Sequence, residues 1–393
     1  MAIRALIDDD PHDLKRNEYP PARLLLLHAS TGAGHRRAAE ALKSALQARN
    51  ATVELLDSVR YIHPLFKLVY VDGGLGMITR WPRIFGTLYS LSDRQTVDRL
   101  MRLPRYGAQR ISARPLLRAV RRFAPDAVIC THFLPAELLA AWRRAGKLAV
   151  PLYVVITDFE PHRIWEHAGI DVYCVASEYA AQRLIADGIP RQAIHVTGIP
   201  ISPDFTRRFD QRALKLRLGL DPGRPLILVT GGGLGAGSIE AIAHAARERE
   251  AQAQFAFVSG NNAELRSRLQ RESTDSGWRV LGYVSNMHEW LAAAAVAIGK
   301  AGGMTASEML AAGVPFVVPP GVKGHEDRNA AYLQVCGAAF VAESAGEAVE
   351  AALSIAQAPD RRARMQTAAR LAARPRAAHS IATIVLRELE RRS

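Results

Sequence analysis

The chain has 393 residues, of which 49% are hydrophobic and 23% charged, and its formal net charge is +13. This composition is ordinary for a globular protein, and at roughly 100–200 residues per domain the length predicts two domains. No stretch approaches the ~18 apolar residues that a membrane-spanning helix requires, and the first twenty residues lack the apolar core of a signal peptide, so we expect neither an integral nor a secreted protein.

The first twenty residues and the cysteines offer no obvious chemistry. Residues 1–20 are polar and of mixed charge, and we expect them to be a disordered lead. The three cysteines, Cys130, Cys174 and Cys336, are far apart in apolar or strand-like surroundings. They indicate reduced core residues of a cytosolic protein rather than metal ligands or disulfides. We therefore expect no metal site.

The first regular elements are a strand over residues 24–27 and a helix over 36–49 with one apolar face. The loop between them contains Gly32 and Gly34, which allow the backbone to approach a ligand closely at a helix N-terminus. No Gly-Lys-Ser/Thr follows, so this is not a Walker phosphate loop. Taken by itself, His35 at the start of the helix is best explained as a locally hydrogen-bonded or capping histidine.

Residues 60–122 are strongly basic, with thirteen Lys or Arg against three Asp, a net charge of +10. Aliphatic and aromatic residues, among them Phe66, Trp81 and Phe85, alternate with the arginines. Apolar anchors with a cationic rim are typical of an element that lies on an anionic membrane surface. The alternative is an insertion that packs on its own domain and exposes its arginines to water.

The alternation of strand and helix resumes with strands over 126–130, 152–157 and 172–175 and a helix over 135–144. Asp158 and His162 follow the second of these strands, and at that edge of a parallel sheet side chains line the ligand crevice. They would help to orient a substrate or a base, and a structural ion pair between them is an equal alternative. The run 195–201 closes a first domain that spans residues 21–205.

A polar linker over 206–223 leads to a second α/β domain over 224–360. This domain opens with a strand at 226–230 and a glycine-rich loop at 231–238. The next strand ends at Asn261 without the carboxylate that would bind an adenosine ribose. The loop is therefore predicted to hold a pyrophosphate rather than a dinucleotide. Residues 361–393 predict a helical C-terminal segment.

Within the second domain, residues 296–318 predict one unit of a doubly wound parallel sheet. A strand over 296–299 precedes the small-residue turn at Gly302 and Gly303, a helix over 305–312 and a strand over 316–318. Gly313 stands where a left-handed C-terminal cap belongs. Glu308, assigned to the first turn of this helix, can accept two hydrogen bonds from a ribose; alternatively it complements the helix dipole.

Four sequence pieces in this domain resemble the nucleotide-sugar site of a known enzyme family. They are Gly282-Tyr-Val-Ser-Asn-Met287, Lys300-Ala-Gly-Gly303, Ser307-Glu308 and Gly324-His-Glu-Asp-Arg-Asn329. In this order and spacing they resemble the monogalactosyldiacylglycerol synthase and processive diacylglycerol glucosyltransferase family. The peptidoglycan lipid-linked N-acetylglucosaminyltransferase is similar but more distant. Residues 28–35 also resemble the acceptor-side loop of the family, and the likeness runs from about residue 24 to 340.

The resemblance implies a GT-B fold, with two Rossmann-like α/β domains whose parallel sheets face a central cleft. It implies an inverting transfer of hexose from UDP-glucose or UDP-galactose to a lipid, most simply diacylglycerol, by a peripheral enzyme on the inner face of the cytoplasmic membrane. No other cofactor and no metal is implied. His35 becomes the candidate general base, with Asp158 as a further catalytic candidate. Some relatives carry an acid where this chain has Ser30.

The resemblance also assigns the binding residues. The donor-binding residues are Gly231, Gly232, Gly233, Gly235, Asn261, Val284, Asn286, Met287, Lys300, Gly302, Gly303, Thr305, Glu308, His325, Glu326 and Asn329. The residues assigned to the acceptor and the membrane are Gly32, Gly34, Phe66, Trp81, Phe85 and His162.

Two other functions fit parts of the sequence. A UDP-N-acetylglucosamine enzyme of the same fold, either a lipid-linked transferase or a 2-epimerase, would use the same donor motifs, although the epimerase has no use for the basic aromatic segment. A nucleic-acid-binding protein would explain the charge of +13, but no RNA- or DNA-binding motif is present. The choice between glucose and galactose and the oligomeric state stay open.

Overall fold

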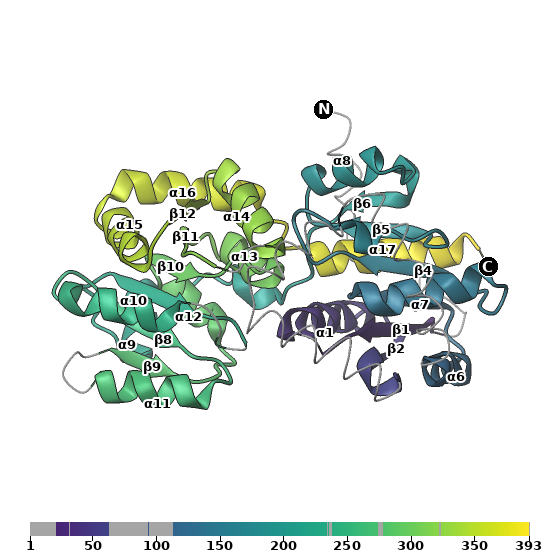
Figure 1. Ribbon diagram of the computed structural model, residues 1–393, viewed down its shortest axis with the longest axis horizontal. Coiled ribbons are helices and arrows are strands. Elements are labelled where there is room, and N and C mark those ends of the chain that lie inside the picture. Colours follow the sequence, from purple (N-terminus) through teal and green to yellow (C-terminus); the bar gives the residue numbers. More distant parts are fainter. Residues whose placement is uncertain are drawn as a thin grey trace.

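The computed structural model describes residues 21–30, 32–62, 93, 113–233, 235, 238–273, 278–321 and 324–392. These residues form two sheets of six parallel strands, which Figure 1 shows in two lobes side by side. The predicted fold class, two Rossmann-like α/β domains of GT-B type, is confirmed. The expected N-terminal lead and the expected membrane anchors Phe66, Trp81 and Phe85 lie outside the described residues.

The first sheet has the strand order β2-β1-β3-β4-β5-β6, and all neighbouring strands are parallel. Its strands are β1 (Arg23–His28), β2 (Thr52–Asp57), β3 (Ala127–Cys130), β4 (Leu152–Val155), β5 (Val172–Val175) and β6 (Ile194–Val196). The helices of this part of the chain are α1 (Ala33–Gln47), α6 (Arg114–Phe123), α7 (Phe133–Arg144) and α8 (Glu178–Ala186).

Side chains of β1 alternate between two cores, as the pleat of a strand requires. Leu25 and Leu27 pack with α6, α7 and α8, whereas Leu24 and Leu26 pack with α1 and with α17 (Ala377–Glu390). Burial of each of these leucines stabilises the fold by about 1.5–3 kcal/mol. The last helix of the chain, yellow in Figure 1, is therefore part of the first lobe.

The second sheet has the strand order β12-β11-β10-β7-β8-β9, again all parallel. Its strands are β7 (Leu226–Thr230), β8 (Gln254–Val258), β9 (Arg279–Leu281), β10 (Val296–Gly299), β11 (Phe316–Val318) and β12 (Ala339–Val341). The helices around it include α10 (Ile239–Ala246), α11 (Ala263–Glu272), α12 (Met287–Ala293), α13 (Gly303–Ala312), α14 (His325–Val335) and α15 (Ala345–Gln357).

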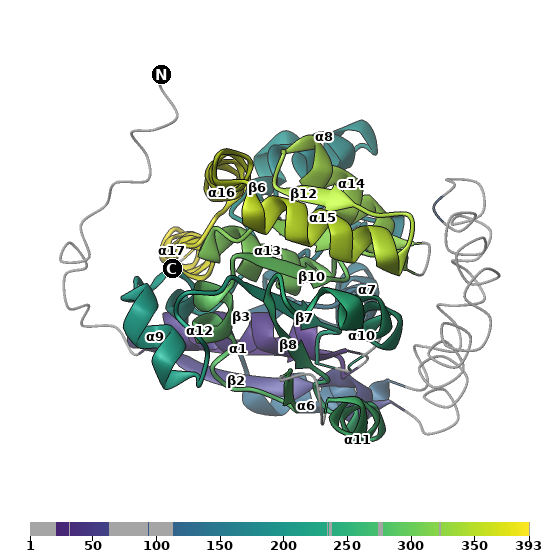
Figure 2. The same ribbon diagram turned by 90° about the vertical axis from the view of Figure 1, so that its left-hand side faces the viewer.

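This sheet is also covered on both faces. Ile227 and Val229 of β7 pack with α10, α11 and α15, whereas Leu226 and Leu228 pack with α12, α13 and α14. Figure 2, with this lobe toward the viewer, shows the strands between these helical layers. Helix α13 belongs to the layer that meets the first lobe, because it packs against α1.

The bounds of α13 correct one prediction. The helix begins at Gly303 rather than at Thr305, so Glu308 lies in its second turn and not in its first. A carboxylate this far from the helix N-terminus gains little from the helix dipole, whose effect fades within the first turn. The C-terminal cap was predicted correctly, because Gly313 has the left-handed conformation, with φ +67°.

The chain crosses between the lobes twice. Residues 206–223, expected to be a linker, contain helix α9 (Gln211–Arg217), which packs on α12 through the buried Leu214. The C-terminal segment forms α16 (Pro359–Ala372) on the second lobe and then α17 on the first (Figure 1). None of the helices in the described residues combines the length and apolar character needed to cross a membrane.

Candidate active site

Each sheet has one point at which its strand order reverses, and parallel sheets bind ligands at such points. In the first sheet this point lies between β1 and β3, and in the second it lies between β7 and β10. The described residues of the four loops that leave these strands are 29–30 with 32, 131–132, 231–233 with 235 and 238, and 300–302. Three of the four contain predicted site residues, so topology and sequence motifs select the same edge of each sheet.

The N-termini of α1 and α13 meet across the two lobes. A Cβ atom on Gly34 would lie 3.2 Å from the side chain of Met304. A Cβ atom on Gly303 would overlap the carbonyl oxygen of Thr157, which follows β4. Glycine is required at Gly303 because the backbones of the two lobes approach this closely. Two helix N-termini, each able to offer N–H groups to an anion, therefore face one region.

The glycine-rich loop after β7 borders the same region. Gly232 and Gly235 adopt left-handed conformations, with φ +68° and +60°. The loop is held by a hydrogen bond from the N–H of Asn261 to the carbonyl oxygen of Gly233 (3.1 Å). A Cβ atom on Gly233 would lie 2.8 Å from that of Ala33, the first residue of α1. The predicted pyrophosphate loop thus touches the helix that carries His35.

His35 is half-buried and is oriented by the backbone after β3. Its Nδ1 lies 2.8 Å from the carbonyl oxygen of Thr131, and the hydroxyl of Thr157 lies 3.1 Å from the same nitrogen. Because a carbonyl oxygen only accepts, Nδ1 carries the proton and Nε2 carries the lone pair. This is the tautomer that a general base needs, and threonines rather than Asp158 fix it.

A second histidine supports this arrangement. The ring of His132 meets the ring of His35 edge to face, with centroids 4.5 Å apart. Burial, reinforced by the nearby His35 and His28, lowers the pKa of His132 well below its usual value. His132 is thus neutral at physiological pH and adds no positive charge beside His35.

Glu308 is the buried acid of the site, with 4% of its surface exposed. Its two carboxylate oxygens lie 3.2 and 3.3 Å from the guanidinium of Arg37 in α1. Burial raises the pKa of Glu308 to about 7, although the charge and hydrogen bonds of Arg37 act in the opposite direction. Arg37 was not among the predicted residues, because no sequence signal connects an exposed-looking arginine to an acid 271 positions away.

The remaining predicted donor residues line the second lobe. Lys300, directly after β10, forms an ion pair with Glu326 of α14, with 2.7 Å between Nζ and Oε1. Asn286, which precedes α12, donates to a glutamate in the first turn of that helix (2.7 Å). The backbone places four further predicted residues in or beside the first turns of α12, α13 and α14: Val284, Met287, Thr305 and His325.

Asn329 connects the two lobes and is fully buried. Its Oδ1 accepts from the N–H of Phe159 (2.8 Å), and its Nδ2 donates to the carbonyl oxygen of Ala301 (3.0 Å) and to Asp158 (3.3 Å). The side chain therefore holds the loop after β4 against the loop after β10. Asp158 is engaged in this contact, and no hydrogen bond joins it to His35 among the described residues.

Replacement of Asn329 by alanine is expected to lower the free energy of unfolding by about 1–3 kcal/mol, because it leaves the buried N–H of Phe159 without a hydrogen-bond acceptor. Urea unfolding followed by tryptophan fluorescence measures this loss. Asn329→Asp keeps the acceptor for Phe159 but sets a buried carboxylate oxygen against the carbonyl oxygen of Ala301 and the carboxylate of Asp158, so it should lose at least as much. An unchanged urea midpoint together with weaker UDP binding would mean that the Asn329 amide binds the UDP-sugar instead of stabilising the fold.

Comparison with known proteins agrees with this geometry. Residues 35–201 match the monogalactosyldiacylglycerol (MGDG) synthase family, and residues 226–381 match the glycosyltransferase family 28 C-terminal domain. The chain therefore combines a region that matches the MGDG synthase family with a glycosyltransferase family 28 C-terminal domain. The predicted resemblance and the predicted class of enzyme, a hexosyltransferase, are confirmed.

Two named relatives and one solved structure illustrate the similarity. A processive diacylglycerol beta-glucosyltransferase of Staphylococcus carnosus is 29% identical over 235 residues, which cover 59% of this chain and 60% of that protein. A probable MGDG synthase 2 of Oryza sativa subsp. japonica is 29% identical over 347 residues, covering 83% and 71%. The crystal structure of MurG from Acinetobacter baumannii shares the fold, with TM-score 0.58, 18% identity and coverage of 93% and 100%.

Asp93 is a structural residue of the glycosyltransferase that the sequence did not reveal. It lies 3.8 Å from Nε2 of the buried His162 and forms ion pairs with Arg183 (3.3 Å) and with Arg328 of α14 (2.9 Å). Burial would raise the pKa of Asp93, but the N–H of Arg163 and these positive charges hold it below its usual value. The predicted partner of His162 was Asp158, and the structure pairs it with Asp93.

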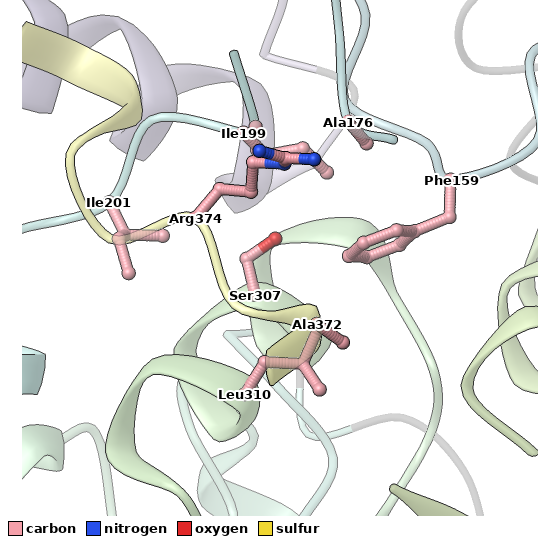
Figure 3. Close-up of a pocket in the computed structure, with 9 residues that line it drawn as sticks. Phe159, Ala176, Ile199, Ile201, Ser307, Leu310, Ala372 and Arg374 are labelled. Atoms are coloured by element: carbon pink, nitrogen blue, oxygen red, sulfur yellow. The ribbon is translucent and has the colours of Figure 1, made fainter. Parts of the chain in front are cut away.

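A small cavity lies between the lobes beside α13 of the glycosyltransferase (Figure 3). It is lined by Phe159 and Ile199 of the first lobe, by Ser307 of α13 and by Arg374 after α16. Its volume of about 10 Å³ is roughly that of one water molecule, so it is not a substrate site. The hydroxyl of Ser307, at the wall of this cavity, donates to the carbonyl oxygen of Gly303 within the helix.

Proposed function

We propose that this glycosyltransferase moves a hexose from a UDP-sugar to the hydroxyl of diacylglycerol with inversion at the anomeric carbon. The observation that carries the proposal is the convergence of three elements: His35 in α1, the glycine loop after β7, and α13 with Glu308. They come from both lobes and meet at the points where the two sheets reverse. This supports a base on one side and a nucleotide site on the other.

In the proposed reaction, the acceptor oxygen bonds to the anomeric carbon while the bond from that carbon to the diphosphate oxygen breaks. Nε2 of His35 takes the acceptor proton, and UDP leaves with the electron pair of the broken bond. The sugar has oxocarbenium character in the transition state, as in glycoside hydrolysis. A single displacement from the opposite face gives inversion.

The departing diphosphate needs positive charge or N–H donors. The N-terminus of α13 and the backbone of the glycine loop supply N–H groups, and they are fixed before the reaction begins, as electrostatic stabilisation requires. Lys300, held by Glu326 at this edge, adds a positive charge. We propose that these groups suffice without a metal ion or another cofactor, with UDP-glucose or UDP-galactose as donor.

We also propose that the first lobe lies on the anionic inner face of the cytoplasmic membrane. The described part of the basic segment includes α6, which buries Leu116 and Val120 and turns its arginines outward. These exposed arginines are Arg114, Arg118, Arg121 and Arg122. Each basic residue near such a surface contributes about 1 kcal/mol.

Charge reversal on α6 is expected to weaken membrane binding. The double change Arg118→Glu and Arg122→Glu should reduce binding to vesicles that contain anionic lipid by on the order of tenfold or more, since two attractions become repulsions. Vesicle sedimentation at low and physiological salt measures the effect. Arg207→Glu with Arg208→Glu, exposed and away from α6, is the matched control. Equal losses in both variants would show that only the net charge matters.

The catalytic proposal is tested by product identity. The purified protein is incubated with diacylglycerol in anionic vesicles and with UDP-glucose, UDP-galactose or UDP-N-acetylglucosamine, and the lipids are analysed by mass spectrometry. A hexosyl-diacylglycerol from one of the first two donors is expected. If UDP-N-acetylglucosamine is the only donor that gives a glycolipid, the lipid-linked N-acetylglucosaminyltransferase is favoured. If UDP-N-acetylglucosamine is epimerised in the absence of lipid, the 2-epimerase is favoured.

A further inference from the structure

Arg37 and Glu308 form an ion pair across the interface of the two lobes, inside the site. Arg37 lies in α1, two residues after His35, and Glu308 lies in α13. The Glu308 side chain is 5% exposed and that of Arg37 is 31% exposed. A carboxylate this deeply buried is stable as an anion only when a cation is paired with it. The first lobe supplies that cation.

Among the described residues of its own lobe, Arg37 has no competing partner. Its hydrogen bonds in the described part of the structure go to the Glu308 carboxylate, and its Nε is buried without a hydrogen-bond acceptor. Its neighbour Arg36 differs, because it points to solvent and pairs with Glu40 one turn along α1. The guanidinium of Arg37 is therefore held by the other lobe.

No other described charged group on the elements packed around α13 pairs with Glu308. Those elements are α1, α12, α14, α16 and the short helix at Pro203–Thr206. Their charged groups near α13 are engaged elsewhere: Glu289 with Arg217, Glu326 with Lys300, Arg328 with Asp93, Asp204 with Arg207, and Arg370 beside Gly313.

We propose that Arg37 is a positioning residue of the donor site, which holds the Glu308 carboxylate for the ribose of UDP and so makes donor affinity depend on contact between the lobes. The proposal rests on the proposed function, in which Glu308 binds the ribose. A carboxylate has about four lone-pair positions, so its bonds to Arg37 leave capacity for two ribose hydroxyls. Arg37 acts through Glu308 and touches neither the sugar nor the reacting atoms.

The pH dependence follows from the burial of Glu308. Its pKa of about 7, above the usual value for a glutamate, means that the carboxyl gains its charge as pH rises through neutrality. Ribose hydroxyls donate more strongly to a charged acceptor than to a neutral one. UDP affinity should therefore increase as pH rises through about 7. Without Arg37, burial is unopposed and this increase moves to higher pH.

The experiment measures UDP affinity by calorimetry from pH 6 to 9 in the full chain and in Arg37→Met, Arg37→Lys, Arg36→Met and Glu308→Gln. Titration of UDP itself is common to all variants and cancels in the ratio to the unmodified protein. We expect Arg37→Met to bind UDP on the order of tenfold more weakly at pH 7 and to recover most of this loss at pH 9. Arg37→Lys and Arg36→Met should stay within about threefold throughout.

Each other outcome has a definite meaning. An Arg37→Met profile equal to that of the unmodified protein would overturn the proposal. So would a loss of affinity that is the same at every pH, which would indicate direct contact with UDP or a general structural role. If Arg37→Met does not fold, Arg37→Gln, which also removes the charge, takes its place, and an undisplaced pH profile in that variant refutes the proposal. Unchanged UDP binding in Glu308→Gln would refute the proposed donor site itself.

Discussion

Replacement of His35 by alanine is expected to lower kcat for lipid glycosylation by about 10²–10⁴-fold while UDP affinity stays within about twofold. General base catalysis is worth this factor in rate. The structure gives the imidazole the tautomer it needs, because the carbonyl oxygen of Thr131 accepts from Nδ1 and leaves the lone pair on Nε2. The donor motifs lie on the other lobe and are not altered by the change. Initial rates with radiolabelled donor, and calorimetry with UDP, measure the two quantities.

Asp158→Asn is the matched comparison for this prediction. Asp158 accepts a hydrogen bond from Asn329 at the lobe interface, and the described residues show no hydrogen bond between it and His35. We expect its loss to cost less than tenfold in kcat, well below the range for a general base. Near-normal turnover in His35→Ala with a large loss in Asp158→Asn would exchange the two roles.

The order of the elements could be predicted because buried parallel strands appear in the sequence as short apolar runs between turns of small residues. The unit from β10 to β11 shows this well, since Gly313 marks the end of α13 by its left-handed conformation. Side-chain identity and backbone conformation report the same boundary here. The resemblance to a family added the roles of residues, which periodicity cannot supply.

The starts of two helices were predicted two or three residues too late. Helix α1 begins at Ala33 and α13 at Gly303, and in both a glycine precedes the helix and no side chain caps it. Helix starts are read from Ser, Thr, Asp or Asn at the cap, and these two lack that signal. Because α13 was predicted to start too late, Glu308 was assigned to its first turn. The helix dipole was therefore expected to matter more for this carboxylate than it does in the second turn.

Contacts between the lobes could not be predicted from the sequence. Glu308 and Arg37 are 271 positions apart, and Asn329 and Phe159 are 170 apart. No local periodicity relates such residues. A buried glutamate does require a cation, so the existence of a partner follows from physics, but its identity depends on how two separately folded sheets meet. Asp93 and Arg328 are a further example of this kind.

Replacement of Glu308 by alanine is expected to weaken UDP binding by about 2 kcal/mol or more, a factor of roughly 30 in Kd. Each hydrogen bond to a charged group is worth about 1.5–3 kcal/mol, and a ribose can offer two. Calorimetry at pH 8 is appropriate, because Glu308 has a pKa of about 7 and is mostly ionised there. Glu240, an exposed acid in the first turn of α10, provides the control variant Glu240→Ala.

A double-mutant cycle decides whether the ribose is the partner of Glu308. The unmodified protein and Glu308→Ala are each titrated with UDP and with 2′-deoxy-UDP, which lacks one of the two hydroxyls. If Glu308 binds that hydroxyl, its removal should cost the unmodified protein about 1.5–3 kcal/mol and the variant almost nothing, so the two changes are not additive. Additive losses would mean that Glu308 acts on α13 or on the lobe interface. Because Arg37 also pairs with this carboxylate, Arg37→Met should shrink the same coupling at pH 7 and restore it at pH 9.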